Sequence, residues 1–140
     1  MNPYHDMVSF HLVKLCKQYY NHLNTRLSEF GLYEGQHSML LTLWMEDGLA
    51  QTELTRRLGV EPASVSKAVE RMEAAGFVQR RPDPEDARAN RIYLTDQAKA
   101  LEEPVKQVLT EVEDRVLTNM SLEEKLLLRR LLLQMRDNLK

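Results

Sequence analysis

Apolar residues recur every three or four positions along the N-terminal part of the chain, which is the spacing of a helix. These residues are Val8, Leu12, Leu15, Tyr19, Leu23, Leu27 and Phe30. A second apolar line through Phe10, Val13 and Tyr20 widens this surface, so the helix should pack on two sides. We expect it to end at Gly31, because glycine adopts the left-handed conformation that terminates many helices.

Three shorter helices are predicted next, and glycine separates each from its neighbour. They should cover about residues 34–46, 52–58 and 62–75. Thr52 can serve as the N-cap of the second, and Pro62 lies in the first turn of the third, where a helix accepts proline. The positions expected to face the core are Met39, Leu40, Leu43, Trp44, Leu54, Leu58, Val60, Val65, Val69 and Met72.

A β-hairpin should follow these helices. Residues 77–81 are typical of a strand, residues 82–90 of a polar turn with two prolines, and residues 91–94 of a returning strand. Two helices that are joined by a tight turn containing glycine and followed by a hairpin form a winged helix-turn-helix. The hairpin is called the wing below.

Two further helices complete the chain. Thr95 can cap the first of them, and Pro104 should kink it because proline removes a backbone hydrogen bond inside a helix. Ser121 and Glu124 have the spacing of a capping box at the start of the last helix. The predicted fold is therefore mainly α with a small β-hairpin wing.

Composition narrows the function by exclusion. The 19 Lys and Arg residues face 21 Asp and Glu residues, so the overall charge gives no sign of a nucleic-acid partner. A single cysteine, Cys16, excludes an intrachain disulfide and a zinc cage built on thiolates. The sequence contains no phosphate-binding glycine loop, metal-ligand cluster or nucleophile motif. We therefore expect that the protein is not an enzyme and uses no cofactor. Without an apolar secretion signal or an apolar run of about 20 residues, we expect a cytoplasmic protein without a membrane partner.

The face of the 62–75 helix that points away from the expected core carries small polar and basic side chains. Ser64, Ser66 and Lys67 can approach base edges in a major groove, whereas Arg71 and Thr52 can hold phosphates. A solvated amphipathic helix would carry a similar face, so this helix alone leaves both interpretations open.

The turn of the hairpin carries the sequence Asp86-Ala87-Arg88. An exposed arginine at a wing tip can enter a narrow, electronegative minor groove. Asp86, two residues earlier, can hold Arg88 in position by an ion pair. The alternative is an ordinary charged turn, in which an exposed ion pair adds little stability.

The segment from Gly76 to Arg88, closed by Ile92-Tyr93-Leu94-Thr95, resembles the signature of the MarR family, the multiple-antibiotic-resistance-type regulators. That pattern places an Asp-x-Arg at the wing and ends the next strand in Leu-Thr. Residues 31–32, 54–60 and 65–73 also fit, so the resemblance covers nearly the whole chain in order and spacing. It implies a transcription regulator, a repressor, that binds a pseudo-palindromic operator in double-stranded DNA.

The resemblance also implies a triangular homodimer in which the first, fifth and sixth helices of both subunits form one core. The last helix supports this, because its many leucines leave little polar surface and a partner chain would cover them. Packing within one subunit is the alternative. On this interpretation residues 1–31 and 101–140 dimerise, and residues 32–100 form the DNA-binding lobe.

Some members of the family bind small phenolic or aromatic acids between the dimer helices and the DNA-binding lobe. The residues that can line such an effector site in this chain are His11, Tyr20, Tyr33, His37 and Trp44. Packing is the alternative role for each of them.

Other members sense oxidants through a cysteine in the first helix, which is where Cys16 lies. In those proteins the cysteine stands about two helical turns farther upstream of the Gly-Leu pair, so Cys16 does not match that position. Inert burial is the alternative for this cysteine. A winged-helix module that binds protein instead of DNA is a further alternative, since a fold alone does not establish a function.

Overall fold

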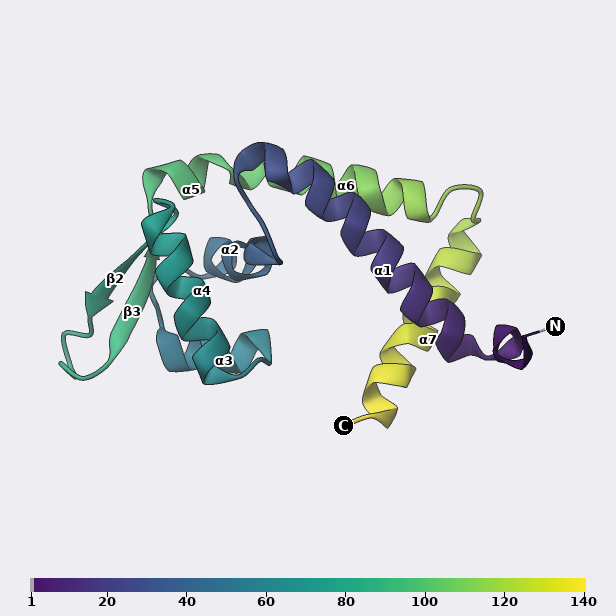
Figure 1. Cartoon of the computed structure of the whole chain (residues 1–140), viewed down its shortest axis with the longest axis horizontal. Helices are drawn as coiled ribbons and strands as arrows, with labels where there is room; N and C mark the ends of the chain where they lie inside the picture. The colour runs from purple at the N-terminus through teal and green to yellow at the C-terminus, as the bar shows by residue number, and fades with distance from the viewer. Residues whose placement is uncertain (1) are drawn as a thin grey trace.

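The computed structural model describes residues 2–140, and Figure 1 shows a lobe of short helices and a hairpin joined by two longer helices to the C-terminal helix. Two short 3-10 helices, η1 and η2, flank the first long helix. The elements are η1 Pro3–Asp6, α1 Val8–Leu27, η2 Ser28–Phe30, α2 Gln36–Met45, β1 Leu49–Ala50, α3 Gln51–Leu58, α4 Pro62–Ala74, β2 Val78–Pro82, β3 Asn90–Leu94, α5 Asp96–Ala100, α6 Glu102–Val116 and α7 Leu122–Asn138. The predicted fold class, mainly α with a hairpin wing, is confirmed.

The core lies in the lobe and continues along the packed faces of α1 and α6. Leu40 and Leu43 of α2, Leu54 of α3 and Val69 of α4 are completely buried in it. Leu23 and Leu27 of α1 and Val105 and Val108 of α6 extend the same apolar cluster. The lobe therefore closes its own core and is joined to α1 and α6 without a break in packing.

The three strands form one antiparallel sheet in the order β1-β3-β2. The register pairs Val78 with Leu94 on the wing side and Leu49 with Ile92 on the other side of β3. β1 has only two residues, which is too short for any alternation of polar and apolar positions, and the sequence did not predict it. Its effect is to tie the start of α3 to the base of the wing.

Two expectations for the lobe were wrong. Ala50, not Thr52, is the N-cap of α3, because β1 runs directly into this helix and leaves Thr52 exposed within its first turn. Val60 is half exposed and not in the core, since the turn between α3 and α4 carries it out of the apolar face. The remaining boundaries agree within a few residues, including Pro62 at the start of α4.

The helix expected after Thr95 is divided into α5 and α6 instead of being kinked. The two helices meet at Leu101, and Pro104 lies in the first turn of α6. Proline cannot donate to the carbonyl four residues earlier and its ring crowds that carbonyl, so the break falls before Pro104. Thr95 caps α5, and Ser121 with Glu124 forms the predicted capping box of α7.

The C-terminal helix α7 contains no buried residue. Its leucines Leu126, Leu127, Leu131, Leu132 and Leu133 are all between 40% and 57% exposed. In Figure 1 this helix descends from the far end of α6, on the side away from the hairpin. Among residues 2–140, no helix is both long and apolar enough to cross a membrane.

Candidate nucleic-acid interface

Helix α4 places the expected base-reading side chains on one face of the lobe. Val65, Val69 and Met72 are buried on its inner side, which turns Ser64 and Lys67 toward solvent. Ser66 is only partly exposed. Lys67 has no ion-pair partner among the described residues, so its ammonium is available to a ligand.

Arg71 lies one turn from the C-terminal end of α4 and already has a protein partner. Its Nη1 atom is 3.1 Å from Oε2 of Glu34, a residue in the turn between η2 and α2. Both side chains are largely exposed, so a phosphate group could replace the carboxylate. The Lys67 ammonium is therefore free of ion pairs in the described chain, whereas the Arg71 guanidinium is already paired.

The outer surface of α3 carries an ion-pair network that the sequence reasoning missed. Glu53 accepts from Arg56 at 2.5 Å and from Arg57 at 3.0 Å, and Arg57 also reaches Glu46 at 2.7 Å. Hydrogen bonds from the two arginines lower the pKa of Glu53 to about 2. The signal was present as acidic and basic residues three and four positions apart. Because each cation is paired, this surface presents little net positive charge beside Thr52.

The wing is built differently from the expectation at Asp86. The Asp86 carboxylate accepts a hydrogen bond from the backbone N–H of Arg88 at 3.0 Å, and it makes no ion pair with the Arg88 guanidinium. The short spacing favours this turn because the carboxylate can reach the nearer backbone group. The ion pair of the wing joins Asp83 and Arg91 instead, at 3.1 Å. Arg88 is exposed at the tip, without an ion-pair partner in residues 2–140.

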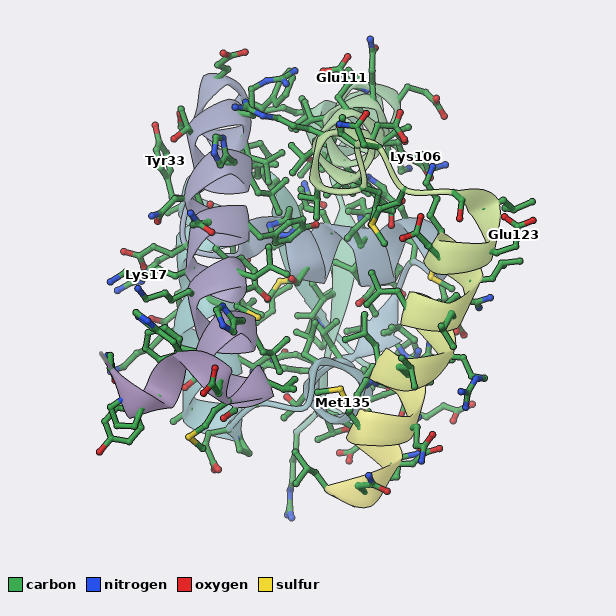
Figure 2. The ribbon with its side chains drawn as sticks, turned by 90° about the vertical axis from the view of Figure 1, so that its right-hand side faces the viewer. Lys17, Tyr33, Lys106, Glu111, Glu123 and Met135 are labelled. Atoms are coloured by element: carbon green, nitrogen blue, oxygen red, sulfur yellow. The ribbon has the colours of Figure 1, made fainter. Side chains whose placement is uncertain are left out.

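The effector residues expected from the sequence divide into two groups. His11, Tyr20 and His37 line one hollow of about 900 Å³ between α1, α2, α6 and α7. Figure 2 shows α1 and α7 on opposite sides, with Met135 on the inner side of α7. Tyr33 is exposed outside this hollow, and Trp44 donates from Nε1 to the Ala98 carbonyl at 3.0 Å, which ties α2 to α5.

Titratable groups of this hollow are perturbed by their surroundings. Burial lowers the pKa of His37, so the imidazole favours its neutral form. Burial, followed by the nearby Glu113 carboxylate, raises the pKa of the Tyr19 phenol. Both side chains can therefore act as neutral hydrogen-bonding groups at neutral pH.

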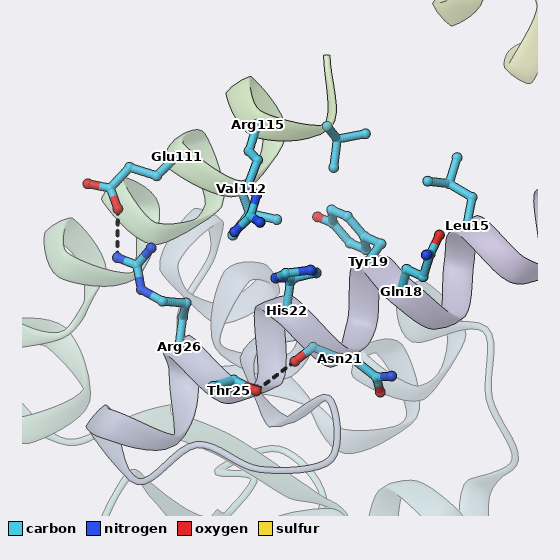
Figure 3. Close-up of a pocket in the computed structure, with 11 residues that line it drawn as sticks. Leu15, Gln18, Tyr19, Asn21, His22, Thr25, Arg26, Glu111, Val112 and Arg115 are labelled. Carbon is cyan, nitrogen blue, oxygen red and sulfur yellow. Dashed lines mark hydrogen bonds and ion pairs between the residues drawn. The ribbon is translucent and has the colours of Figure 1, made fainter. Parts of the chain in front are cut away.

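A second cavity of about 590 Å³ lies between α1 and α6 alone (Figure 3). His22 and Arg115 point into it, and the ion pair between Arg26 and Glu111, at 2.6 Å, closes one end. No residue of the lobe helices α2 to α4 lines this cavity. A ligand bound here would therefore not touch helices α2 to α4 directly, in contrast to one bound near His37.

Cys16 lies on α1 and is exposed in the single chain. Inert burial within the subunit is therefore wrong for this cysteine. Residues 2–140 contain no cluster of three or more histidine, cysteine or acidic side chains that could hold a metal ion.

Comparison with known proteins gives one consistent result. A sequence model described as the MarR family matches residues 32–89. The uncharacterized HTH-type transcriptional regulator YwoH of Bacillus subtilis is 33% identical over 102 residues, which cover 73% of this chain and 74% of YwoH. A second regulator of that organism, YdgJ, is 31% identical, and the match covers 78% of this chain and 66% of YdgJ, just under two thirds of its length.

Among solved structures, a mutant of MarR from E. coli in complex with operator DNA superimposes with a TM-score of 0.85 at 21% identity. The match covers 96% of this chain and 99% of the other. At this identity the likeness shows the fold, including the arrangement of the helix-turn-helix and the wing. Both named relatives are HTH-type transcriptional regulators.

Proposed function

Because the chain belongs to the MarR family of transcription regulators, we propose that it binds a pseudo-palindromic operator in double-stranded DNA as a homodimer and represses transcription from it. The observation that carries this proposal is the lobe surface formed by α4 and the wing. Lys67 and Arg88 are exposed on it without ion-pair partners in the described chain, while the neighbouring arginines of α3 are neutralised. An operator occupied by such a dimer would block transcription.

The contacts divide by role. We assign Ser64, Ser66 and Lys67 to base edges in a major groove, with Thr52 and, after release from Glu34, Arg71 holding phosphates. Arg88 is assigned to the minor groove beside each half-site. Asp86 supports it by fixing the backbone of the tip through its bond to the Arg88 N–H.

The test compares binding to a duplex selected by the protein from a random library with binding to the unselected pool. Lys67→Ala should change which bases are preferred, and Arg88→Ala should weaken binding to both duplexes, by roughly tenfold for the selected one. Lys125→Ala, which removes an exposed charge from α7, is the matched control and should change neither. Equal affinity of the wild-type protein for both duplexes would contradict sequence-specific binding, and no measurable binding to either duplex would favour a protein-interaction module.

Asp86 provides a second test of the wing. Asp86→Asn keeps the side-chain oxygen that accepts from the Arg88 N–H, whereas Asp86→Ala removes it. Both changes remove the same negative charge, which by itself would tighten binding to DNA. If only Asp86→Ala weakens binding, the Asp86 side chain positions the wing tip through this hydrogen bond. Equal tightening in both variants would contradict that role.

We also propose that a small aromatic or phenolic acid releases the DNA by binding in the hollow near His11, Tyr20 and His37. This hollow reaches α2, so a ligand there contacts both the long helices and the lobe. Benzoate and 4-hydroxybenzoate are suitable probes. His37→Ala should raise the concentration that releases DNA, and His22→Ala, in the cavity of Figure 3, should not. Equal responses of the two variants would contradict this site.

Oxidant sensing through Cys16 is the second candidate for regulation, and the exposure of its thiol favours it. Hydrogen peroxide should then release DNA from the wild-type protein and not from Cys16→Ser. Identical behaviour of both proteins would exclude this role.

A further inference from the structure

One arginine of the central strand joins three separate segments of the lobe. Arg91 lies on β3 and contacts both the turn of the wing and the turn that precedes β1. We propose that Arg91, together with Asp83, is a positioning residue that holds the wing at a fixed angle to α3 and α4. The inference rests on the proposed function, because the angle matters only if the wing and α4 bind the same duplex.

The geometry uses two different edges of the guanidinium. Nε is 3.1 Å from Oδ2 of Asp83, and Nη1 donates to the carbonyl oxygen of Gly48 at 2.8 Å. A planar guanidinium can hold two acceptors in different directions at once, whereas a lysine ammonium on its flexible stem cannot fix both. Arg91 therefore couples the orientation of the wing turn to that of the Gly48 turn.

Asp83 is built firmly into the wing. Its side chain is only 11% exposed. Its second carboxylate oxygen, Oδ1, accepts from the backbone N–H of Glu85 at 2.9 Å, and its own N–H donates to the Ala89 carbonyl at 2.9 Å. A contact that fixes the Asp83 carboxylate therefore restrains both sides of the turn that carries Arg88.

The Gly48 turn is anchored equally well on the other side. Oδ1 of Asp47 accepts from the backbone N–H groups of Gly48, at 2.9 Å, and of Leu94, at 2.8 Å. The chain then passes through the two residues of β1 into α3, which begins at Gln51. Arg91 consequently connects the wing to the first turn of the helix-turn-helix.

The position of Arg91 along the sheet explains why this connection is needed. β1 pairs only with Ile92 and Arg91, so Arg91 is the last residue toward the tip with strands on both sides. Beyond it the wing is a two-stranded ribbon, which twists more freely than a wider sheet. The bond to Asp83 reaches past this boundary and restrains the ribbon where the third strand is missing.

The test is a double-mutant cycle that combines Arg91→Gln with Arg88→Ala, measured on the selected duplex. If Arg91 acts by positioning Arg88, Arg91→Gln alone should weaken binding roughly tenfold, and it should add less than about twofold once Arg88 is alanine. Additive losses would overturn the proposal, because they indicate that Arg91 acts independently of the wing tip. Arg91→Lys should behave like Arg91→Gln, since full rescue by lysine would indicate a role of charge alone.

Arg81→Gln is the matched control, because Arg81 lies opposite Arg91 across the sheet. The substitution removes the same charge from the neighbouring strand. Its effect should be additive with that of Arg88→Ala. If Arg88→Ala alone has no effect, the wing contact of the proposed function is wrong and the inference falls with it. If Arg88→Ala weakens binding and Arg91→Gln does not, only the inference is wrong.

Amide hydrogen exchange without DNA tests the same idea independently. Exchange at the N–H groups of Asp83 and Ala89 should accelerate in Arg91→Gln, and in the milder variant Asp83→Asn, but not in Arg88→Ala. Circular dichroism must show that the variants are folded. Unchanged exchange in a folded Arg91→Gln protein would overturn the restraint of the wing.

Discussion

The lobe of helices α2 to α4 and the helix α7 are both rich in leucine, but the lobe buries its leucines and α7 exposes them. Leu40, Leu43 and Leu54 of the lobe are completely buried by residues of the same chain. Leu131 and Leu132 of α7 are about 40% exposed, and no residue of α7 is buried. Apolar composition thus does not determine burial within a subunit. The lobe leucines are covered by neighbours from the same chain, whereas the described residues do not cover the α7 leucines. Contiguous exposed apolar surface of this kind often marks an interaction site.

The largest expected effect is the loss of the dimer when this α7 surface is charged. Leu131→Glu should convert the protein to a monomer. It should also weaken binding to a two-half-site operator by about 100-fold or more, because one bound subunit no longer brings its partner to the second half-site. Analytical ultracentrifugation and titration of the same duplex measure the two consequences. Gln134→Glu places the same charge on an exposed position of the same helix and should leave both unchanged.

A Leu131→Glu protein that remains dimeric would contradict the proposal that the partner chain packs on the exposed α7 leucines. A monomer that still binds a two-half-site operator as tightly as the wild type would contradict the symmetric mode of binding. The proposed division into dimerisation helices and a DNA-binding lobe depends on the same two measurements.

The next effect tests the other half of the comparison. Leu54→Ala in α3 should lower the free energy of unfolding by about 2–5 kcal/mol, because it leaves a cavity in a core that cannot collapse around it. Leu139→Ala, at a position that is 91% exposed, is the matched control and should change little. Urea unfolding should show the Leu54 loss at every protein concentration. A loss that disappears at high concentration would mean that the lobe also depends on the partner.

Sequence alone predicted the lobe well because its signals are local. The helical spacing of apolar residues, Pro62 at the start of α4 and the capping residue Thr95 each act within a few positions. The same reasoning misplaced the start of α3, since Thr52 is a favourable cap and only the pairing of β1 with β3 decides against it. That pairing joins residues about 40 positions apart.

The candidate site was predicted only in part, because local signals fix which side chains are exposed but not which partners they meet. The exposure of Lys67 and Arg88 follows from helical and hairpin geometry, which sequence spacing contains. The partners of charged residues do not follow from spacing, because Arg91 is paired with Asp83, eight residues away, and Arg71 with Glu34, 37 residues away. The expected pair of Asp86 and Arg88 was wrong because a closer backbone N–H competes for the carboxylate.

A smaller effect concerns pH and the junction of the lobe with the long helices. Burial lowers the folded-state pKa of His37 below its unfolded value of 6.5, so below that pH the unfolded chain binds more protons than the folded one. The free energy of unfolding should therefore decrease as the pH falls through about 6.5 toward the folded-state pKa. His37→Gln should reduce this slope in urea titrations between pH 7.5 and 5.5, an interval of about two pH units around the unfolded-state pKa. The exposed His22, changed to glutamine, should leave the slope as it is.

The smallest effect sharpens the comparison at the surface, where Glu34 competes with DNA for Arg71. Glu34→Gln removes the carboxylate that lies 3.1 Å from the guanidinium, so more of Arg71 is available to a phosphate. Because the pair is exposed, the gain in affinity should be about threefold or less, and it should disappear at high salt. Glu29→Gln controls for the loss of a negative charge from the same segment. In the Arg71→Ala background Glu34→Gln should have no effect, and a gain that persists there would show that Glu34 repels DNA directly and that Arg71 does not bind a phosphate.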